Sequence, residues 1–325
     1  MEEVKALKYL GFVISDNASN VANILDKKNK STTTIRNIMN IIQGLGIYTI
    51  QNGFIYLNSL LRASLLYAAE TYFNLTEKNL RLIESIEEDC MRKILGTGKS
   101  CSMSLLYLET GHLPARFQID IMMLNFLQYI LHQGHDSLMF KFFKAQCESP
   151  TRGDWVLNVK KVIKNINLNI TFEEITHMKK HKYQTLVNEK VRTSAFQYLL
   201  SKVKSKGKEI NYRSLFQCQE YLLPNNFLTL NEQREIFSYR TRMNKLKYNF
   251  SGNNDKEFFE YGVEMTNLHL YECLKLNRNN KTVPYVKIFE RRPCEMKSIL
   301  NILQQNQAKH NEFTQAQDHL LRATS

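Results

Sequence analysis

The chain has 325 residues, of which 43% are hydrophobic and 23% are charged, and its formal net charge is +13. This length and apolar content suffice to bury one or two cores, and the positive charge indicates a polyanionic partner, either nucleic acid or an anionic membrane surface. No stretch is apolar enough to span a membrane, no signal peptide is apparent, and the six cysteines include no CxxC pair, which predicts an intracellular protein, nuclear or cytoplasmic.

Few turn signals interrupt the chain. Only 12 glycines and five prolines are present, which favours long helices over many short strands. The segment 8–15 (KYLGFVIS) predicts one short strand, or a strand and a bend, because it gathers aromatic and β-branched residues around a glycine. The expected fold class is therefore mainly α with a short N-terminal strand.

Apolar residues three and four positions apart predict helices through most of the chain. One is expected over residues 20–44, and a second over 52–69, whose apolar side chains point nearly all round and place it centrally in the core. Later helices are expected over 74–96, from Leu113-Pro114 to about residue 132, near residue 140, within 171–204 and within 229–242.

Capping signals mark several of these helix ends. Asn74 and Glu77 have the spacing of a capping box, and Gly96 closes the helix that they open. The same spacing recurs at the starts of two later helices, at Thr171/Glu174 and Thr229/Glu232.

Two shifts in composition divide the chain. A Ser-Pro step, a glycine and several charges gather at residues 148–154, and a polar segment follows at 249–256. These shifts predict a helical domain over 1–149, a basic helical domain over 150–248, a small module over 249–305 and a frayed tail over 306–325.

Five segments carry motifs in a fixed order along the chain. They read KYLG at 8–11, LLYAAETYFNLTE at 65–77, CMRKILG at 90–96, TGHLPAR at 110–116, and RTRM at 240–243 with NF at 249–250. Taken together, they resemble the thumb and the region after it in reverse transcriptases of non-LTR (LINE-type) retrotransposons. The resemblance implies a thumb-like domain over 1–149, with Arg92 and Arg116 at positions where the family's motifs have arginine.

The same resemblance assigns a role to the first motif. Lys8, Tyr9, Leu10 and Gly11 match the element that forms the family's primer grip, where strand and turn backbone hold the growing 3′ end. In the second motif the sequence departs from the family pattern. Ala68 stands where the family has glycine, and Tyr72 stands where it has tryptophan.

The catalytic part of such an enzyme is missing from this sequence. Reverse transcription needs paired palm aspartates that hold two metal ions, and no Asp-Asp pair occurs in the chain. The prediction is therefore a non-enzymatic fragment that binds RNA or DNA. Two alternatives stay open: a structural or protein-interaction remnant with no nucleic-acid role, and a truncated gene model of a full RNA-directed DNA polymerase.

The module over 249–305 resembles the family's terminal zinc knuckle in its second half only. His269 and Cys273 match the HxxxC half, whereas aromatic residues stand at the ligand positions of the CxxC half, within 258–262. A structural zinc site needs four nitrogen or sulfur ligands. We therefore expect a degenerate knuckle with vestigial His269 and Cys273, no bound metal and no cofactor.

Most of the positive charge lies in the second part of the chain. Residues 1–150 hold 15 Lys/Arg against 14 Asp/Glu, whereas residues 151–325 hold 29 against 17. Such a surface attracts backbone phosphates, although the alternative is a basic surface without a partner. The predicted nucleic-acid contacts are Lys160, Lys161, Lys164, Lys179, Lys180, Lys182, Lys190, Arg192, Lys202, Lys204, Lys206 and Lys208.

Three aromatic residues are interleaved with this basic stretch: Tyr183, Phe196 and Tyr198. Exposed aromatics could stack on unpaired bases. The competing interpretation, which the helical spacing favours, is that they form the buried stripe of a helix. No membrane partner and no small-molecule substrate are expected.

Overall fold

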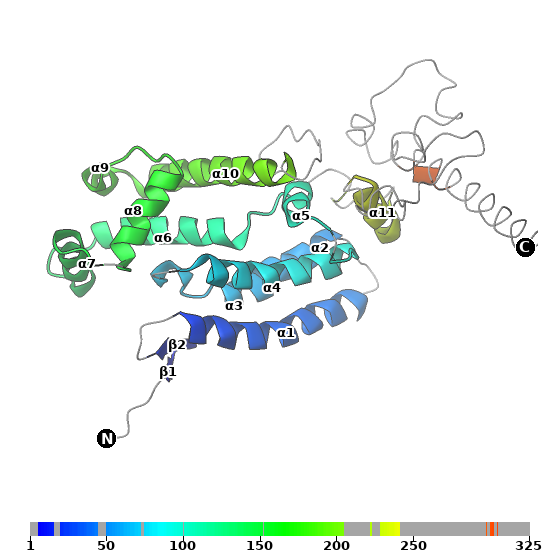
Figure 1. Ribbon diagram of the computed structural model, residues 1–325, viewed down its shortest axis with the longest axis horizontal. Coiled ribbons are helices and arrows are strands. Elements are labelled where there is room, and N and C mark those ends of the chain that lie inside the picture. Colours follow the sequence, from blue (N-terminus) through cyan, green and yellow to red (C-terminus); the bar gives the residue numbers. More distant parts are fainter. Residues whose placement is uncertain are drawn as a thin grey trace, which may run out of the picture.

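A computed structural model describes residues 6–15, 20–44, 50–72, 75–99, 101–151, 153–204 and 228–240, together with positions 222, 297, 300, 301 and 304. Within these residues the chain is mainly helical with one two-stranded sheet near the N-terminus, which confirms the expected fold class at this level (Figure 1). Four residues of the predicted sites lie outside the described residues, as does most of the knuckle module: Lys206, Lys208, His269 and Cys273.

The N-terminal strand prediction resolves into a hairpin. Strand β1 (Ala6–Tyr9) pairs antiparallel with β2 (Phe12–Ser15), and Tyr9 lies opposite Phe12. The turn between them has positive φ at Leu10 (46°) and Gly11 (83°), as in a type I′ hairpin. A second strand forms where the sequence predicted one strand, or a strand and a bend, because the glycine accepts this left-handed turn.

Helix α1 (Val21–Gly44) is continuous through its polar middle, as expected from its apolar spacing. Its inner side carries four isoleucines that are each at most 4% exposed, Ile24, Ile35, Ile38 and Ile42, together with the buried polar residues Asn23, Lys27 and Ser31. The hairpin docks on its first turn, where the amide of Val13 donates to Asn23 Oδ1 at 3.2 Å.

The second predicted helix consists of three joined pieces: α2 (Ile50–Tyr56), the π-helical η1 (Leu57–Arg62) and α3 (Ala63–Leu65). It is buried along one side, since Ile55 and Leu60 are 54% and 40% exposed, which differs from the expected burial all round. The chain leaves it through Ala68, whose φ is 55°, and enters the 3₁₀ helix η2 (Ala69–Thr71).

Three helices then enclose much of the core: α4 (Glu77–Leu95), α5 (Met103–Thr110) and α6 (Ala115–Leu131). The N-cap of α4 is Thr76, whose hydroxyl accepts the Asn79 amide at 3.2 Å, so the expected cap at Asn74 is wrong. Gly96, with φ 65°, ends α4 as expected. The sequence missed α5 because all of residues 105–110 are buried and show no apolar–polar period.

Five further helices follow within the described residues: α7 (Leu138–Glu148), α8 (Trp155–Asn165), α9 (Phe172–His177), α10 (Lys180–Lys204) and α11 (Leu230–Arg240). Helix α8 was not expected from the sequence. The predicted capping box of α9 is present: the Glu174 amide donates to the Thr171 hydroxyl at 3.2 Å, and the Thr171 amide donates to the Glu174 carboxylate at 2.7 Å. Thr229 and Glu232 form the same reciprocal pair before α11.

The long helices stack in layers, from α1 through α4 and α6 to α10 (Figure 1). Contacts cross the expected domain boundary at 148–154. The Trp155 indole N–H donates to the Glu70 carbonyl at 2.8 Å, and the Tyr183 hydroxyl donates to the Leu124 carbonyl at 3.2 Å. Residues on both sides of this boundary therefore pack together, and their division into two domains stays a prediction.

Candidate nucleic-acid interface

The predicted nucleic-acid contacts are spread along α8 and α10. Lys180 and Lys202 stand near opposite ends of α10, about 33 Å apart at 1.5 Å of rise per residue. Lys190 is half-buried, and Lys204 closes α10 with a side chain outside the described residues. The remaining described members are all exposed: Lys160, Lys161, Lys164, Lys179, Lys180, Lys182, Arg192 and Lys202.

The interleaved aromatic residues serve packing. Tyr183 is fully buried, and its hydroxyl donates to the Leu124 carbonyl. Phe196 and Tyr198 are partly buried against the core. The expectation of a buried stripe is therefore confirmed for Tyr183 and in part for the other two, which leaves the exposed cations as the groups available to phosphates.

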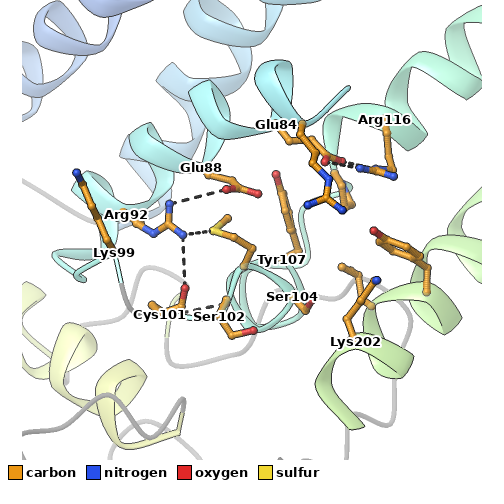
Figure 2. Close-up of a pocket in the computed structure, with 15 residues that line it drawn as sticks. Glu84, Glu88, Arg92, Lys99, Cys101, Ser102, Ser104, Tyr107, Arg116 and Lys202 are labelled. Carbon is orange, nitrogen blue, oxygen red and sulfur yellow. Dashed lines mark hydrogen bonds and ion pairs between the residues drawn. The ribbon is translucent and has the colours of Figure 1, made fainter. Parts of the chain in front are cut away.

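Lys202 enters a cleft of about 490 Å³ between α4, α5, α6 and α10 (Figure 2). Two carboxylates, Glu84 and Glu88, line this cleft together with five cations: Arg81, Arg92, Lys99, Arg116 and Lys202. We call this hollow, with its five cations, the cationic cleft. Helix α10 thus brings one lysine of the predicted set against four cations from the first 150 residues, where positive and negative charges nearly balance.

Arg92 forms part of the wall of the cleft. Its Nη1 lies 3.8 Å from Glu88 Oε2, and its Nη2 donates to the Met103 sulfur at 2.6 Å and to the Cys101 carbonyl at 3.4 Å (Figure 2). Its Nε is buried and has no hydrogen-bond partner within the described residues. The guanidinium therefore retains donor capacity that its neighbours leave unused.

Arg116 is fixed by two carboxylates. Its Nε and Nη2 lie 2.6 and 2.7 Å from the two oxygens of Glu84, and Nη2 lies 2.9 Å from Glu77 Oε1. Such a bidentate pair holds a guanidinium in one orientation. Arg116 therefore holds a fixed position in the wall of the cleft, and much of its charge is balanced.

Glu88 makes the charge of the cleft depend on pH. Burial raises the pKa of Glu88 to about 7, Arg92 opposes this rise, and the carboxylates of Glu84 and Glu87 add to it. Near neutral pH the Glu88 carboxyl is therefore partly protonated and cancels only part of the Arg92 charge. The cleft becomes more positive as the pH falls through this range.

Other lysines of the predicted set lie in different hollows. Lys179 and Lys182 share an open depression with Glu173 and Glu174, whose carboxylates offset their charge. Lys161 lines a second cavity, between α4, α6, α8 and α10. Among the described residues, the cationic cleft is therefore the hollow in which a lysine of the predicted set lies together with several other cations.

The primer-grip-like residues form the hairpin tip rather than part of the cleft. Tyr9 and Leu10 are 62% and 74% exposed, and Lys8 Nζ pairs with Asp26 at 3.2 Å on α1. In the stack of helices, α1 and α10 are the outermost layers (Figure 1). The hairpin and the cationic cleft are accordingly two separate surfaces.

Counting charges along the sequence missed most of the cationic cleft. Arg81 and Lys99 stand in the first 150 residues, where positive and negative charges nearly balance, and no local pattern sets them apart. The sequence did single out two of the five cations through the resemblance, because Arg92 and Arg116 are the arginines of two of the motifs quoted above. The structure places both on one cleft.

Comparison with models of protein families, with curated proteins and with solved structures finds no match to this chain. Within the described residues, no three His, Cys, Asp or Glu side chains gather as a metal site requires. None of the helices in the described ranges combines the length and apolar character of a membrane span.

Proposed function

We propose that the chain binds RNA or DNA through backbone phosphates, with the cationic cleft as its principal contact, and that it does so without catalysing a reaction. The observation that carries this proposal is the convergence of five cations from four parts of the fold on one concave surface. Cations outnumber carboxylates by five to two in its lining, and an excess of positive charge in a concave site attracts polyanions. The exposed lysines of α8 and α10 extend the positive surface beyond the cleft.

The absence of catalysis is proposed from the sequence, which contains no paired aspartates for two metal ions. We further propose that the chain derives from the thumb region of a non-LTR retrotransposon reverse transcriptase. One backbone observation supports this lineage. Ala68, which stands where the family has glycine, adopts the left-handed conformation that glycine accepts without strain.

The test is a titration of the full chain with a single-stranded RNA at several salt concentrations. Counterion release makes log affinity fall linearly with log salt, with a slope of about −0.7 for each phosphate neutralised on a single strand. The double variant Lys99→Glu/Lys202→Glu should bind at least about tenfold more weakly and with a flatter slope. Lys28→Glu/Lys78→Glu is the matched control, because these exposed lysines lie outside the cleft.

A second arm separates the cleft from the other lysines. Lys180 and Lys182 lie in the first turn of α10, Lys179 directly precedes it, and Lys202 lies near the other end of that helix. Reversing these three lysines to Glu should therefore weaken binding less than the two reversals in the cleft. Equal loss in the cleft variant and in the control would mean that only net charge matters. No binding at micromolar protein near physiological salt would refute nucleic-acid binding altogether.

An exposed apolar surface on α7 favours the second candidate, a protein-interaction role. Leu138 and Phe142 are 69% and 61% exposed, and Met139 is 37% exposed. Apolar side chains grouped on one helix are typical of a protein contact. This candidate replaces the first if the chain binds no nucleic acid.

A further inference from the structure

A second cavity adjoins the cationic cleft. It has a volume of about 340 Å³ and lies between α4, α6, α8 and α10. Arg116 and Tyr198 line both cavities, and the Arg116 guanidinium carbon lies 5.4 Å from the centre of the Tyr198 ring. A ligand could therefore occupy the second cavity and extend past Arg116 into the cleft.

The walls of this second cavity are mainly apolar. Phe117, Ile119, Met123 and Ile166 line it, and each is at most 8% exposed. A volume of this size with apolar walls and a few converging polar groups is typical of a small-ligand site. Apolar walls suit the two faces of a planar ring.

Two polar groups in the cavity have hydrogen-bonding capacity that the protein does not use. The Asn158 amide nitrogen on α8 is buried without a partner within the described residues. The Asp120 carboxyl group on α6 makes no hydrogen bond or ion pair within those residues. Burial raises the pKa of Asp120 to about 7, Arg116 opposes this rise, and a ligand that donates to the carboxylate favours its ionised form. A buried donor without a partner is costly, and a ligand that accepts from it recovers that loss.

The arrangement therefore calls for a planar ligand that donates to a carboxylate and accepts from an amide. A carboxylate accepts two parallel N–H groups well. Guanine alone among the common bases presents two adjacent N–H donors beside a carbonyl oxygen on one edge. Adenine, cytosine and uracil each place an acceptor where the second donor would have to be.

We propose that this cavity binds a guanine base, with the Asp120 carboxylate accepting its two edge N–H groups and the Asn158 amide donating to its carbonyl oxygen. Arg116 lies one turn before Asp120 on the same face of α6, so the attached phosphate is directed toward the cationic cleft. Lys161, exposed on α8, also lines the cavity and adds a cation for that phosphate. The direction of the phosphate rests on the proposed function, whereas recognition of the base does not.

The experiment measures binding of guanosine 5′-monophosphate and adenosine 5′-monophosphate to the full chain by calorimetry. The guanine nucleotide should bind at least about tenfold more tightly, since a good bidentate contact discriminates by this order. Asp120→Asn should abolish the preference, because an amide cannot accept two N–H groups. Asn158→Leu should weaken the guanine nucleotide selectively, without lowering stability, since it removes an unpaired donor.

A third ligand, an adenine-only RNA strand, separates this inference from the proposed function. If that strand binds through the cleft but the two nucleotides bind equally, or if Asp120→Asn retains the preference, the guanine site is refuted and the function stands. If the guanine nucleotide is preferred but the strand does not bind, the guanine site stands and nucleic-acid binding fails. Lys202→Glu should weaken both nucleotides by a similar factor, because it affects the phosphate and not the base.

Discussion

The Lys27 amino group lies 2.8 Å from the Tyr72 hydroxyl oxygen, although Lys27 is only 4% exposed and Tyr72 is fully buried. The same amino group donates to the carbonyls of Leu65, at 3.1 Å, and Tyr67, where α3 ends. The Asn23 amide also donates to the Tyr72 hydroxyl, at 3.0 Å. Burial lowers the pKa of Lys27 to about 8, so at neutral pH a cation still caps this helix end.

Tyr72→Phe should destabilise the protein by about 1–3 kcal/mol. Removing the hydroxyl leaves the buried donors of Lys27 and Asn23 without one of their acceptors, and a buried unsatisfied donor costs about this much. Urea unfolding measures the change. Tyr56→Phe is the control, because the Tyr56 hydroxyl has no hydrogen bond within the described residues and its loss should change stability by less than about 0.5 kcal/mol.

Glu87→Ala should cost more, about 3–5 kcal/mol, because it removes a fully buried carboxylate and breaks its ion pair with the largely buried Arg62. The same carboxylate accepts from the Tyr107 hydroxyl at 2.8 Å and from the Ala115 amide at 3.2 Å, so it links four helical segments. Glu88→Gln on the same helix should not destabilise the protein at pH 7. A loss for Glu87→Ala no larger than that of an exposed residue would contradict this role.

Ala68→Gly should stabilise the protein by up to about 1 kcal/mol. The left-handed conformation of Ala68 costs a residue with a Cβ about 1–2 kcal/mol, and glycine avoids this cost. Glycine also has more freedom in the unfolded chain, which cancels about 0.4–1 kcal/mol of the gain in stability. Ala63→Gly, at an exposed position of α3, should instead destabilise by about 0.5–1 kcal/mol. Opposite signs for the two substitutions are the expected result of thermal unfolding.

Binding of an adenine-only RNA strand should strengthen as the pH falls from 8 to 6, partly through Glu88. A bound phosphate favours the protonated form of Glu88, whose folded pKa of about 7 lies inside this window. The raised pKa also determines how Glu88 affects stability. Because the pKa of Glu88 in the folded protein exceeds the ordinary value of 4.5, its contribution to stability is lost as the pH rises from about 4.5 to 7.

Glu88→Gln isolates this contribution, because it leaves every other titratable group of the protein in place. The variant should show a smaller pH dependence of RNA affinity than the wild type and should bind more tightly at pH 8. Identical pH profiles for the two proteins would show that Glu88 does not act on the cleft.

Local signals in the sequence predicted those parts of the fold that depend on a few neighbouring residues. Gly96 marks the end of α4, and the capping pair Thr171/Glu174 marks the start of α9. Both signals are local, because the hydrogen bonds involved form within one turn of the helix. The apolar spacing over residues 20–44 sufficed for α1 because that helix has one buried face. Helix α5 escaped prediction because it is buried on nearly every side.

The candidate site required the tertiary structure. The sequence determined that the chain is helical, basic in its second part and without paired aspartates. The packing of α10 against α5 and α6 decided that Lys202 lines the same cleft as Arg92 and Lys99, about one hundred residues earlier in the chain. No local rule could give this, because the charge of a residue is fixed by its chemistry, whereas the field at a surface depends on which distant residues folding brings together.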